Sequence, residues 1–306
     1  MRSQGGRTDR RCARSSSDRA GTGIRPVKKL IIILPLAIAA CNPQPEGKPV
    51  QRYELDPPGK AAQADDPVAE PTPIATPTPA AESACERVTF EGAALTHCVA
   101  DPAKHQIAMK LGPEGGAPWR GFSGLKASLP PETSVAFAVN GGMFNGEGKP
   151  IGYYVEASQR LKELNRNDGP GNFHLKPNGV FYGSGGSWRI RTSDDFFAKV
   201  GDRPQFGTQS GPMLVIDGKL HPEITDDGPS KAIRNGVGVD AKGRAHFVIS
   251  EEPLSFGKIA RYFRDELKTP NALFLDGNVS ALWDPASDRM DSRAPIGPLI
   301  VVTKKD

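Results

Sequence analysis

A long proline-rich segment decides which part of this chain can fold into a compact domain. Residues 42–83 contain ten of the 29 prolines and a single aromatic residue, Tyr53. Such a segment cannot bury enough apolar surface to fold and is typical of an extended spacer. We therefore expect residues 41–84 to form a disordered linker and residues 85–306 to form one folded domain.

The residues before this linker are typical of an export signal. Lys28 and Lys29 precede the apolar run Leu30–Ala40, which is followed by Cys41. The run is interrupted by Pro35 and is too short to span a bilayer, which takes about 20 helical residues. A positive flank, a short apolar core and small residues before the cleavage point characterise a signal peptide. We expect the chain to be exported.

The last residues of this run, Ile38-Ala39-Ala40-Cys41, resemble the lipobox of bacterial lipoproteins, in which the cysteine is lipidated. The resemblance implies a leader and lipoprotein signal peptide over residues 1–40 and a lipid on Cys41. The protein would then be anchored in the bacterial cell envelope, in the periplasm or at the outer membrane. Residues 1–26 have no apolar pattern, so we expect translation to begin at Val27.

The charge distribution argues against a nucleic-acid partner. The net charge is +4, but residues 1–40 alone carry +7, so the remainder of the chain sums to −3. A basic DNA-binding domain is therefore excluded as the leading interpretation. Contact with a membrane is expected only through the lipid anchor.

Two cysteines fall at the start of the expected domain. Cys85 and Cys98 are thirteen positions apart, whereas Cys12 lies in the leader. In an oxidising compartment this pair predicts a disulfide that closes an N-terminal β-hairpin. A metal pair or a catalytic thiol is the alternative, although no His/Cys cluster has ligand spacing.

The domain itself reads as α+β, rich in strands and with few helices, built on a mixed sheet. One helix is predicted after Ser255, with Phe256, Ile259 and Phe263 on one face, and it should stop at Thr269-Pro270. A weaker helical pattern covers 193–199. Strands are predicted at 87–91, 94–99, 105–111, 134–139, 151–156, 178–182, 187–191, 213–216, 235–239, 245–249, 272–275 and 298–302.

Polar residues on tight turns follow several of these strands, which is how scaffolds present functional groups. After the strand 134–139 come Asn140, Gly141 and Gly142, where the glycines permit close approach to a ligand, or simply make a turn. Glu156 ends an aromatic-rich strand and is either an acid–base group or an ordinary solvated glutamate.

Three further segments have the same character. Asn172 lies in the segment Asn172-Phe173-His174, and Gln209 and Ser210 precede the strand 213–216, without the G-x-S-x-G frame of a serine hydrolase. Asp276 follows the apolar strand 272–275, where a catalytic carboxylate or an Asp-Gly hairpin turn is equally expected. Arg234 has the planar fork that binds phosphate or carboxylate.

The motifs that are present and absent limit the reactions that the protein could catalyse. The chain has neither standard phosphate-binding glycine loop nor an H-E-x-x-H motif. The polar groups suit acid–base chemistry on a sugar or a phosphoryl ester. No cofactor or metal is expected. Ca²⁺ at Asp226-Asp227 is the alternative, but no D-x-D-x-D loop occurs.

Six segments occur in the order and spacing of the phosphodiester glycosidase domain family, over about 105–302. They are NGGMF, GYYVE, GNFHLKPNGVF, TQSGPMLVIDG, IRNGVGVD and ALFLDGNVSAL. The chain thus resembles this family, and most closely its bacterial members. Animal-type members more often continue the Asp-Gly turn with glycines, whereas Asn278-Val279 follow here.

The resemblance implies an exported hydrolase that cleaves the bond between a sugar anomeric carbon and a phosphodiester on a glycan. The alternatives are a non-catalytic glycan-binding envelope lipoprotein and an accessory protein of exopolysaccharide processing. As a hypothesis, Glu156 and Asp276 supply the carboxylates, Arg234 holds phosphate, and Asn140 and Ser210 place sugar hydroxyls. The remaining expected substrate-binding residues are Gly141, Gly142, Asn172, Gln209, Asn278 and Ser280.

Overall fold

The computed structural model describes residues 82–277 and 279–305. The expected signal peptide, Cys41 with its expected lipid, most of the linker and Asn278 lie outside the described residues. Within the described part, no helix is long and apolar enough to cross a membrane.

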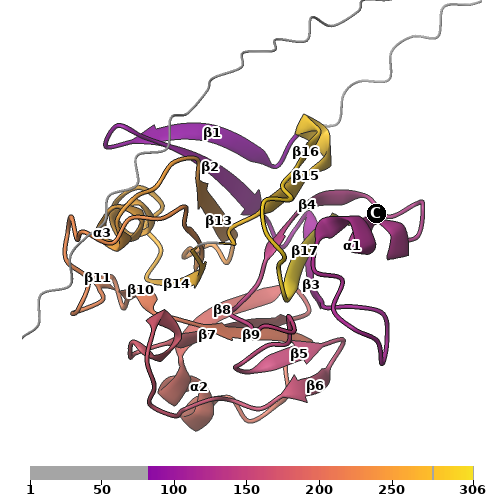
Figure 1. Cartoon of the computed structure of the whole chain (residues 1–306), viewed down its shortest axis with the longest axis horizontal. Coiled ribbons are helices and arrows are strands. Elements are labelled where there is room, and N and C mark those ends of the chain that lie inside the picture. The colour runs from indigo at the N-terminus through magenta and orange to yellow at the C-terminus, as the bar shows by residue number, and fades with distance from the viewer. Residues whose placement is uncertain (1–81, 278, 306) are drawn as a thin grey trace, which may run out of the picture. The chain divides into compact units, whose positions relative to one another are not determined.

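Seventeen strands form three antiparallel sheets in this part of the chain (Figure 1). The first sheet has the order β1 (Cys85–Phe90), β2 (Ala93–Ala100), β13 (Ala245–Ser250), β12 (Asn235–Val239), β14 (Asn271–Asp276), β10 (Met213–Ile216) and β11 (Lys219–Leu220). The second has the order β16 (Arg289–Met290), β15 (Leu282–Asp284), β4 (Val135–Asn140), β17 (Leu299–Lys304) and β3 (His105–Lys110). The third has the order β6 (Gln159–Lys162), β5 (Tyr154–Glu156), β9 (Phe206–Ser210), β7 (Gly179–Ser184) and β8 (Ser187–Thr192).

One face of each sheet packs into a shared core. Phe247 of the first sheet lies 5.4 Å from Phe137 of the second and 5.9 Å from Phe181 of the third, measured between ring centroids. All three rings are almost completely buried. Because edge-to-face aromatic contacts are favourable and directional, this trio fixes how the three sheets meet.

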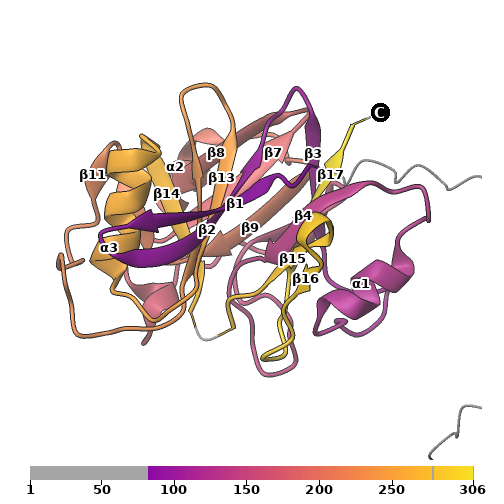
Figure 2. The ribbon, with the colours of Figure 1, turned by 90° about the horizontal axis from the view of Figure 1, so that it is seen from above.

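The other face of each sheet is covered by one short helix. Helix α3 (Phe256–Arg261), continued by a π-helical turn over Tyr262–Glu266, covers the first sheet, and α1 (Phe122–Ser128) covers the second. Helix α2 (Ser193–Lys199) covers the third. Figures 1 and 2 show α3 and α1 on opposite sides of the molecule. Since these helices and the shared core cover the central strands, the polar side chains described below gather at strand ends.

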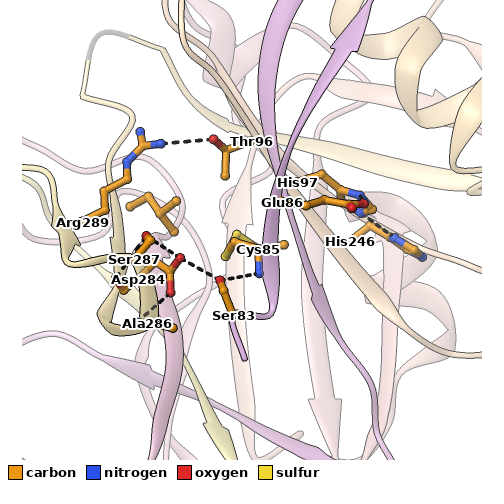
Figure 3. The surroundings of a disulfide bond; sticks show 12 residues. Ser83, Cys85, Glu86, Thr96, His97, His246, Asp284, Ala286, Ser287 and Arg289 are labelled. Atoms are coloured by element: carbon orange, nitrogen blue, oxygen red, sulfur yellow. Dashed lines mark hydrogen bonds and ion pairs between the residues drawn. A yellow bond between two sulfur atoms is a disulfide. The ribbon is translucent and has the colours of Figure 1, made fainter. Parts of the chain in front are cut away.

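The predicted disulfide is confirmed. Cys85 and Cys98 lie opposite each other on β1 and β2 and are bonded. Beside the bond, the Ser83 hydroxyl accepts from the Cys85 amide at 2.9 Å and donates to the Asp284 carboxylate at 2.8 Å (Figure 3). The disulfide therefore joins the two strands of the first hairpin, and the hydrogen bond from Ser83 attaches this hairpin to the second sheet.

The strand-rich α+β domain with few helices is confirmed, but its strands form three antiparallel sheets and not the predicted mixed sheet. Each of the twelve predicted strands overlaps an observed one. The predicted helix begins as expected, with Ser255 Oγ accepting from the Lys258 amide at 3.1 Å. Five strands were not predicted, namely β6, β9, β11, β15 and β16, nor was α1. Among these, β9 carries Gln209 and Ser210.

Candidate active site

Polar side chains from all three sheets meet where their strands end. Asn140 ends β4, Ser210 ends β9, Asn235 begins β12 and Asp276 ends β14, with Ser280 in the turn that follows. We call these five residues the Asp276 cluster. No single sheet supplies it, so the cluster exists only when the three sheets are packed together.

Two buried asparagines form the centre of the cluster. Asn235 Nδ2 donates to Asn140 Oδ1 at 2.8 Å, and the Ala281 amide donates to the same oxygen at 2.9 Å. Each asparagine side chain is 1 % exposed. Since buried amides are costly unless their hydrogen bonds are made, this pair holds β4 and β12 at a fixed separation.

Asn235 also positions the end of β14. Its Oδ1 accepts from the Asp276 amide at 3.0 Å and from Ser280 Oγ at 3.2 Å. From the other side, Ser210 Oγ donates to the Leu275 carbonyl at 2.7 Å. The backbone around Asp276 is therefore fixed by side chains from two different sheets.

The carboxyl group of Asp276 has an unusual environment. Burial raises its pKa to about 6, and the hydrogen bond from the Gly277 amide, 2.6 Å long, lowers it only in part. The residue is still partly exposed, unlike Asn140, Asn235 and Ser210. A carboxyl that titrates near neutral pH and reaches solvent is suited to proton transfer.

Glu156 lies elsewhere. The pairing of Tyr154 with Thr208 on β9 places Glu156 beside the start of β9, roughly 13 Å along the strand from Ser210. Its carboxylate accepts from Lys110 Nζ at 3.3 Å and from the Tyr154 hydroxyl at 2.9 Å. Measured along β9, Glu156 therefore lies apart from Ser210, a member of the Asp276 cluster.

Arg234 is buried beneath α3. Its guanidinium carbon lies 3.5 Å from the centroid of the Phe256 ring, and its Nε donates to the Leu254 carbonyl at 2.9 Å. Nη2 donates to the carbonyl and hydroxyl of Ser230 at 2.9 and 3.0 Å. Burial lowers the pKa of Arg234 to about 10, so it remains charged at neutral pH. Because neighbouring strand residues face opposite ways, Arg234 points away from Asn235.

Gln209 is fully occupied by the protein. Its Oε1 accepts from the amides of Tyr153 and Asn165, both at 2.9 Å, and its Nε2 donates to the Asn165 carbonyl at 2.7 Å and to Ser193 Oγ at 2.9 Å. All four hydrogen-bonding positions of the amide are used. Gln209 therefore attaches β9 to its neighbours and to the start of α2.

The two glycines after Asn140 allow close packing. A Cβ atom at Gly142 would lie 2.1 Å from the Gln209 carbonyl oxygen, and one at Gly141 would lie 3.0 Å from Met109 Cε. The Gly142 amide donates to Thr208 Oγ1 at 3.0 Å. Gly142 therefore brings the second and third sheets together beside the cluster, while Gly141 permits close packing against Met109 of β3.

The expected substrate residue Asn172 begins a 3-10 turn, Asn172–His174, and is exposed. Its carbonyl oxygen would lie 3.2 Å from a Cβ atom at Gly211, which follows Ser210. Asn172 is thus near the cluster, and Asn278 lies outside the described residues. In the described part of the chain, no group of three or more His, Cys, Asp or Glu side chains could hold a metal ion.

Sequence reasoning missed Asn235, although it follows Arg234 in a motif already singled out. A polar residue at the first position of an apolar strand was the available signal. Thr208 was missed because β9 was not predicted as a strand.

This strand-rich α+β domain gathers amides, hydroxyls and one partly exposed carboxyl at its strand ends, groups that suit the chemistry of a glycosidase. The family model of phosphodiester glycosidases matches residues 133–303, more than half of the chain. The chain belongs to the phosphodiester glycosidase family, and this membership supports a glycosidase-type function.

Several individual proteins are similar to this chain. It is 33 % identical over 205 residues to YigE of Escherichia coli K12, described as an uncharacterized protein, covering 67 % of this chain and 80 % of YigE. The catalytic domain of zebrafish N-acetylglucosamine-1-phosphodiester alpha-N-acetylglucosaminidase has a similar fold, with a TM-score of 0.50 and 14 % identity over 72 % of this chain and 82 % of that one. A hypothetical protein from Synechocystis gives a TM-score of 0.46 at 15 % identity, covering 72 % and 61 %.

Proposed function

We propose that this protein hydrolyses the bond between a sugar anomeric carbon and a phosphodiester on a glycan, with Asp276 as the catalytic carboxyl. The observation that carries the proposal is a partly exposed carboxyl whose pKa is raised to about 6 by burial and whose backbone is held by side chains from two sheets. The family match supports the choice of substrate class.

The reaction needs little help at the leaving group. A phosphate is stable as an anion once the bond from the anomeric carbon to oxygen breaks, so strong general-acid assistance is less necessary than for an ordinary glycoside. What is needed is activation of water. In the proposed step, the water oxygen bonds to the anomeric carbon, its proton passes to the Asp276 carboxylate, and the phosphomonoester leaves with the bonding electrons.

The buried members of the cluster act on Asp276 and not on substrate in this proposal. Asn140 and Asn235 are hydrogen-bonded to each other, and Ser210 donates to a backbone carbonyl. They fix the position of the carboxyl, and a fixed donor and acceptor geometry lowers the cost of reorganisation during reaction. Ser280 is partly exposed beside Asp276 and is the better candidate for contact with a sugar hydroxyl.

The test compares two carboxylate variants on a sugar-1-phosphodiester. Asp276→Asn should lower kcat by about 10²-fold or more, the usual contribution of a general acid–base group. Glu156→Gln is the matched control and should stay within about threefold of wild type, because Glu156 lies about 13 Å along β9 from Ser210. Wild-type kcat in Asp276→Asn would refute the assignment. Tight glycan binding with no released phosphate in the wild type would favour the binding-module alternative.

We also propose that the protein is exported and carries a lipid on Cys41. The support is the basic, apolar and small-residue order of residues 28–41. Cells labelled with a radioactive fatty acid should incorporate the label into wild type and not into Cys41→Ser. Label in the variant, or no label in the wild type, would contradict lipidation.

A further inference from the structure

A cavity of about 500 Å³ lies on the outer face of the third sheet, beside α2 and the β5–β6 hairpin. It does not include Asp276. Its lining combines three aromatic rings with three arginines, namely Tyr153, Phe196, Phe197, Arg160, Arg166 and Arg203. Two carboxylates, Glu163 and Asp202, complete the charged part of the lining.

Of the three aromatic rings, Phe197 offers an apolar surface to solvent. Tyr153 and Phe196 pack with ring centroids 4.8 Å apart and are buried, whereas Phe197 is 65 % exposed. The guanidinium carbon of Arg166 lies 4.4 Å from the Phe197 ring centroid. The electron-rich face of an aromatic ring attracts both cations and the C–H groups of a sugar ring.

The arginines are held only loosely by the protein. Arg160 pairs with Glu163 and Arg166 with Asp194, each at 3.0 Å, and all four side chains are at least 40 % exposed. Arg203 donates to the Ser158 carbonyl at 3.4 Å. Exposed ion pairs of this kind are weak, so phosphate oxygens can replace the carboxylates and take two hydrogen bonds from one guanidinium.

A series of neighbouring residues lies between the cavity and the Asp276 cluster. Arg166 also lines a second cavity of about 260 Å³, which extends to Lys176 and Asn178. The Cβ atom of Asn178 would lie 2.7 Å from a Cβ at Gly211. Gly211 follows Ser210, which is hydrogen-bonded to the residue before Asp276.

We infer that the cavity between α2 and the β5–β6 hairpin binds a sugar–phosphate unit of a phosphodiester-linked glycan, away from the bond that is cleaved. Sugar rings would lie against Phe197, and the phosphates between units would bind Arg166 and Arg203. The inference rests on the proposed function for the class of ligand and makes the substrate a polymer of sugar phosphates.

The experiment measures binding without turnover. Calorimetry uses the Asp276→Asn protein and an oligomer of glucose 1-phosphate units joined by phosphodiester bonds, with the neutral glucose oligomer as a second probe. Adding Phe197→Ala or Arg203→Ala should weaken binding of the charged oligomer by about fivefold to tenfold each. Leu161→Ala, a 56 % exposed apolar residue outside the cavity lining, and Arg87→Ala, a remote arginine, are the matched controls and should bind as the parent does.

The outcomes separate this inference from the proposed function. If the cavity variants bind the charged oligomer as tightly as the parent, or if the neutral oligomer binds equally well, the inference is wrong even when the protein cleaves a small sugar-1-phosphodiester. If the wild type cleaves nothing but binding is lost in Phe197→Ala and Arg203→Ala, the site stands and the hydrolytic function fails.

Discussion

Asn235 Nδ2 donates a 2.8 Å hydrogen bond to Asn140 Oδ1, and this contact joins the first sheet to the second at the candidate active site. The residues are 95 positions apart in the sequence. Asn235 Oδ1 simultaneously accepts the amide of Asp276. The position of Asp276, the only carboxyl in the cluster, therefore depends on the hydrogen-bonded pair Asn140 and Asn235.

Asn235→Ala should reduce both stability and activity. The substitution leaves the Asp276 amide and one position on Asn140 without a partner, which costs about 1–3 kcal/mol for buried groups. Urea unfolding measures the loss, and Asn167→Ala, at an exposed position, should change stability by less than about 0.5 kcal/mol. In a double-mutant cycle of Asn140→Ala and Asn235→Ala, we expect the two changes in unfolding free energy to be coupled. Additive changes would show that the two residues act independently.

Gly142→Ala should be far more damaging than Gly146→Ala. A methyl group at Gly142 would lie 2.1 Å from the Gln209 carbonyl oxygen, whereas one at Gly146 would meet nothing within 4 Å. Overpacking of this kind costs about 1–3 kcal/mol, and here it also pushes the second sheet away from β9. Thermal unfolding and turnover of the two proteins provide the comparison, and equal behaviour would show that the sheets can separate without loss.

The elements of this fold could be predicted from the sequence wherever apolar residues form a local pattern. The continuous apolar run at 213–216 is one example, and the helix after Ser255 is another, because its cap and its apolar face are both local. In contrast, β9 contains Gly207, Thr208 and Gln209 and has no alternation. It becomes a strand because β5 and β7 pair with it on either side and because distant groups satisfy its polar side chains.

The candidate site was readable only in part for the same reason. Asp276 was suggested by its place after an apolar strand, and it is the carboxyl that the cluster surrounds. Glu156 had the same local signature, yet the pairing of β5 with β9 places it far from Ser210. A sequence gives the order of the strands along the chain but not their order in the sheets, so it could not distinguish these two carboxylates.

The pH dependence of kcat/KM should report the ionisation of Asp276. If the carboxylate accepts the proton of water, activity requires the deprotonated form, so kcat/KM should fall about tenfold per pH unit below about pH 6 and level off above it. Initial rates over a range of pH test this. A rate that instead falls above pH 6 would show that Asp276 acts as an acid.

Asp276→Asn should stabilise the protein at neutral pH while it removes activity. The ordinary pKa of an aspartate carboxyl is 3.8, and burial raises that of Asp276 to about 6 in the folded protein. Folding therefore favours the protonated form. The contribution of the Asp276 carboxyl to the unfolding free energy is fully present below pH 3.8 and is lost as the pH rises through 6. The loss is at most about 3 kcal/mol. Unfolding in urea should show a more stable variant at about pH 7.5 and no difference near pH 4.

Two histidines at the other end of the first sheet should make the protein acid-sensitive. His97 Nε2 and His246 Nδ1 lie 2.9 Å apart, and His246 Nε2 lies 3.1 Å from an Asp240 oxygen. Glu86 lies 3.6 Å from His97 Nδ1, and Figure 3 shows Glu86, His97 and His246 together to the right of the disulfide. Burial, then the charges of His246 and Arg244, lower the pKa of His97 to about 4, and burial also lowers that of His246 despite Asp240.

Because the unfolded histidines titrate near pH 6.5, protons bind the unfolded chain first as the pH falls. The unfolding free energy is therefore unaffected by the two histidines above about pH 6.5. It decreases as the pH falls to about 4, by up to about 3 kcal/mol for His97. His97→Gln should flatten the dependence of the unfolding free energy on pH in this window, while His174→Gln, a partly exposed histidine outside the pair, should follow the wild-type curve. Parallel curves for wild type and His97→Gln would mean that the pair does not resist protonation.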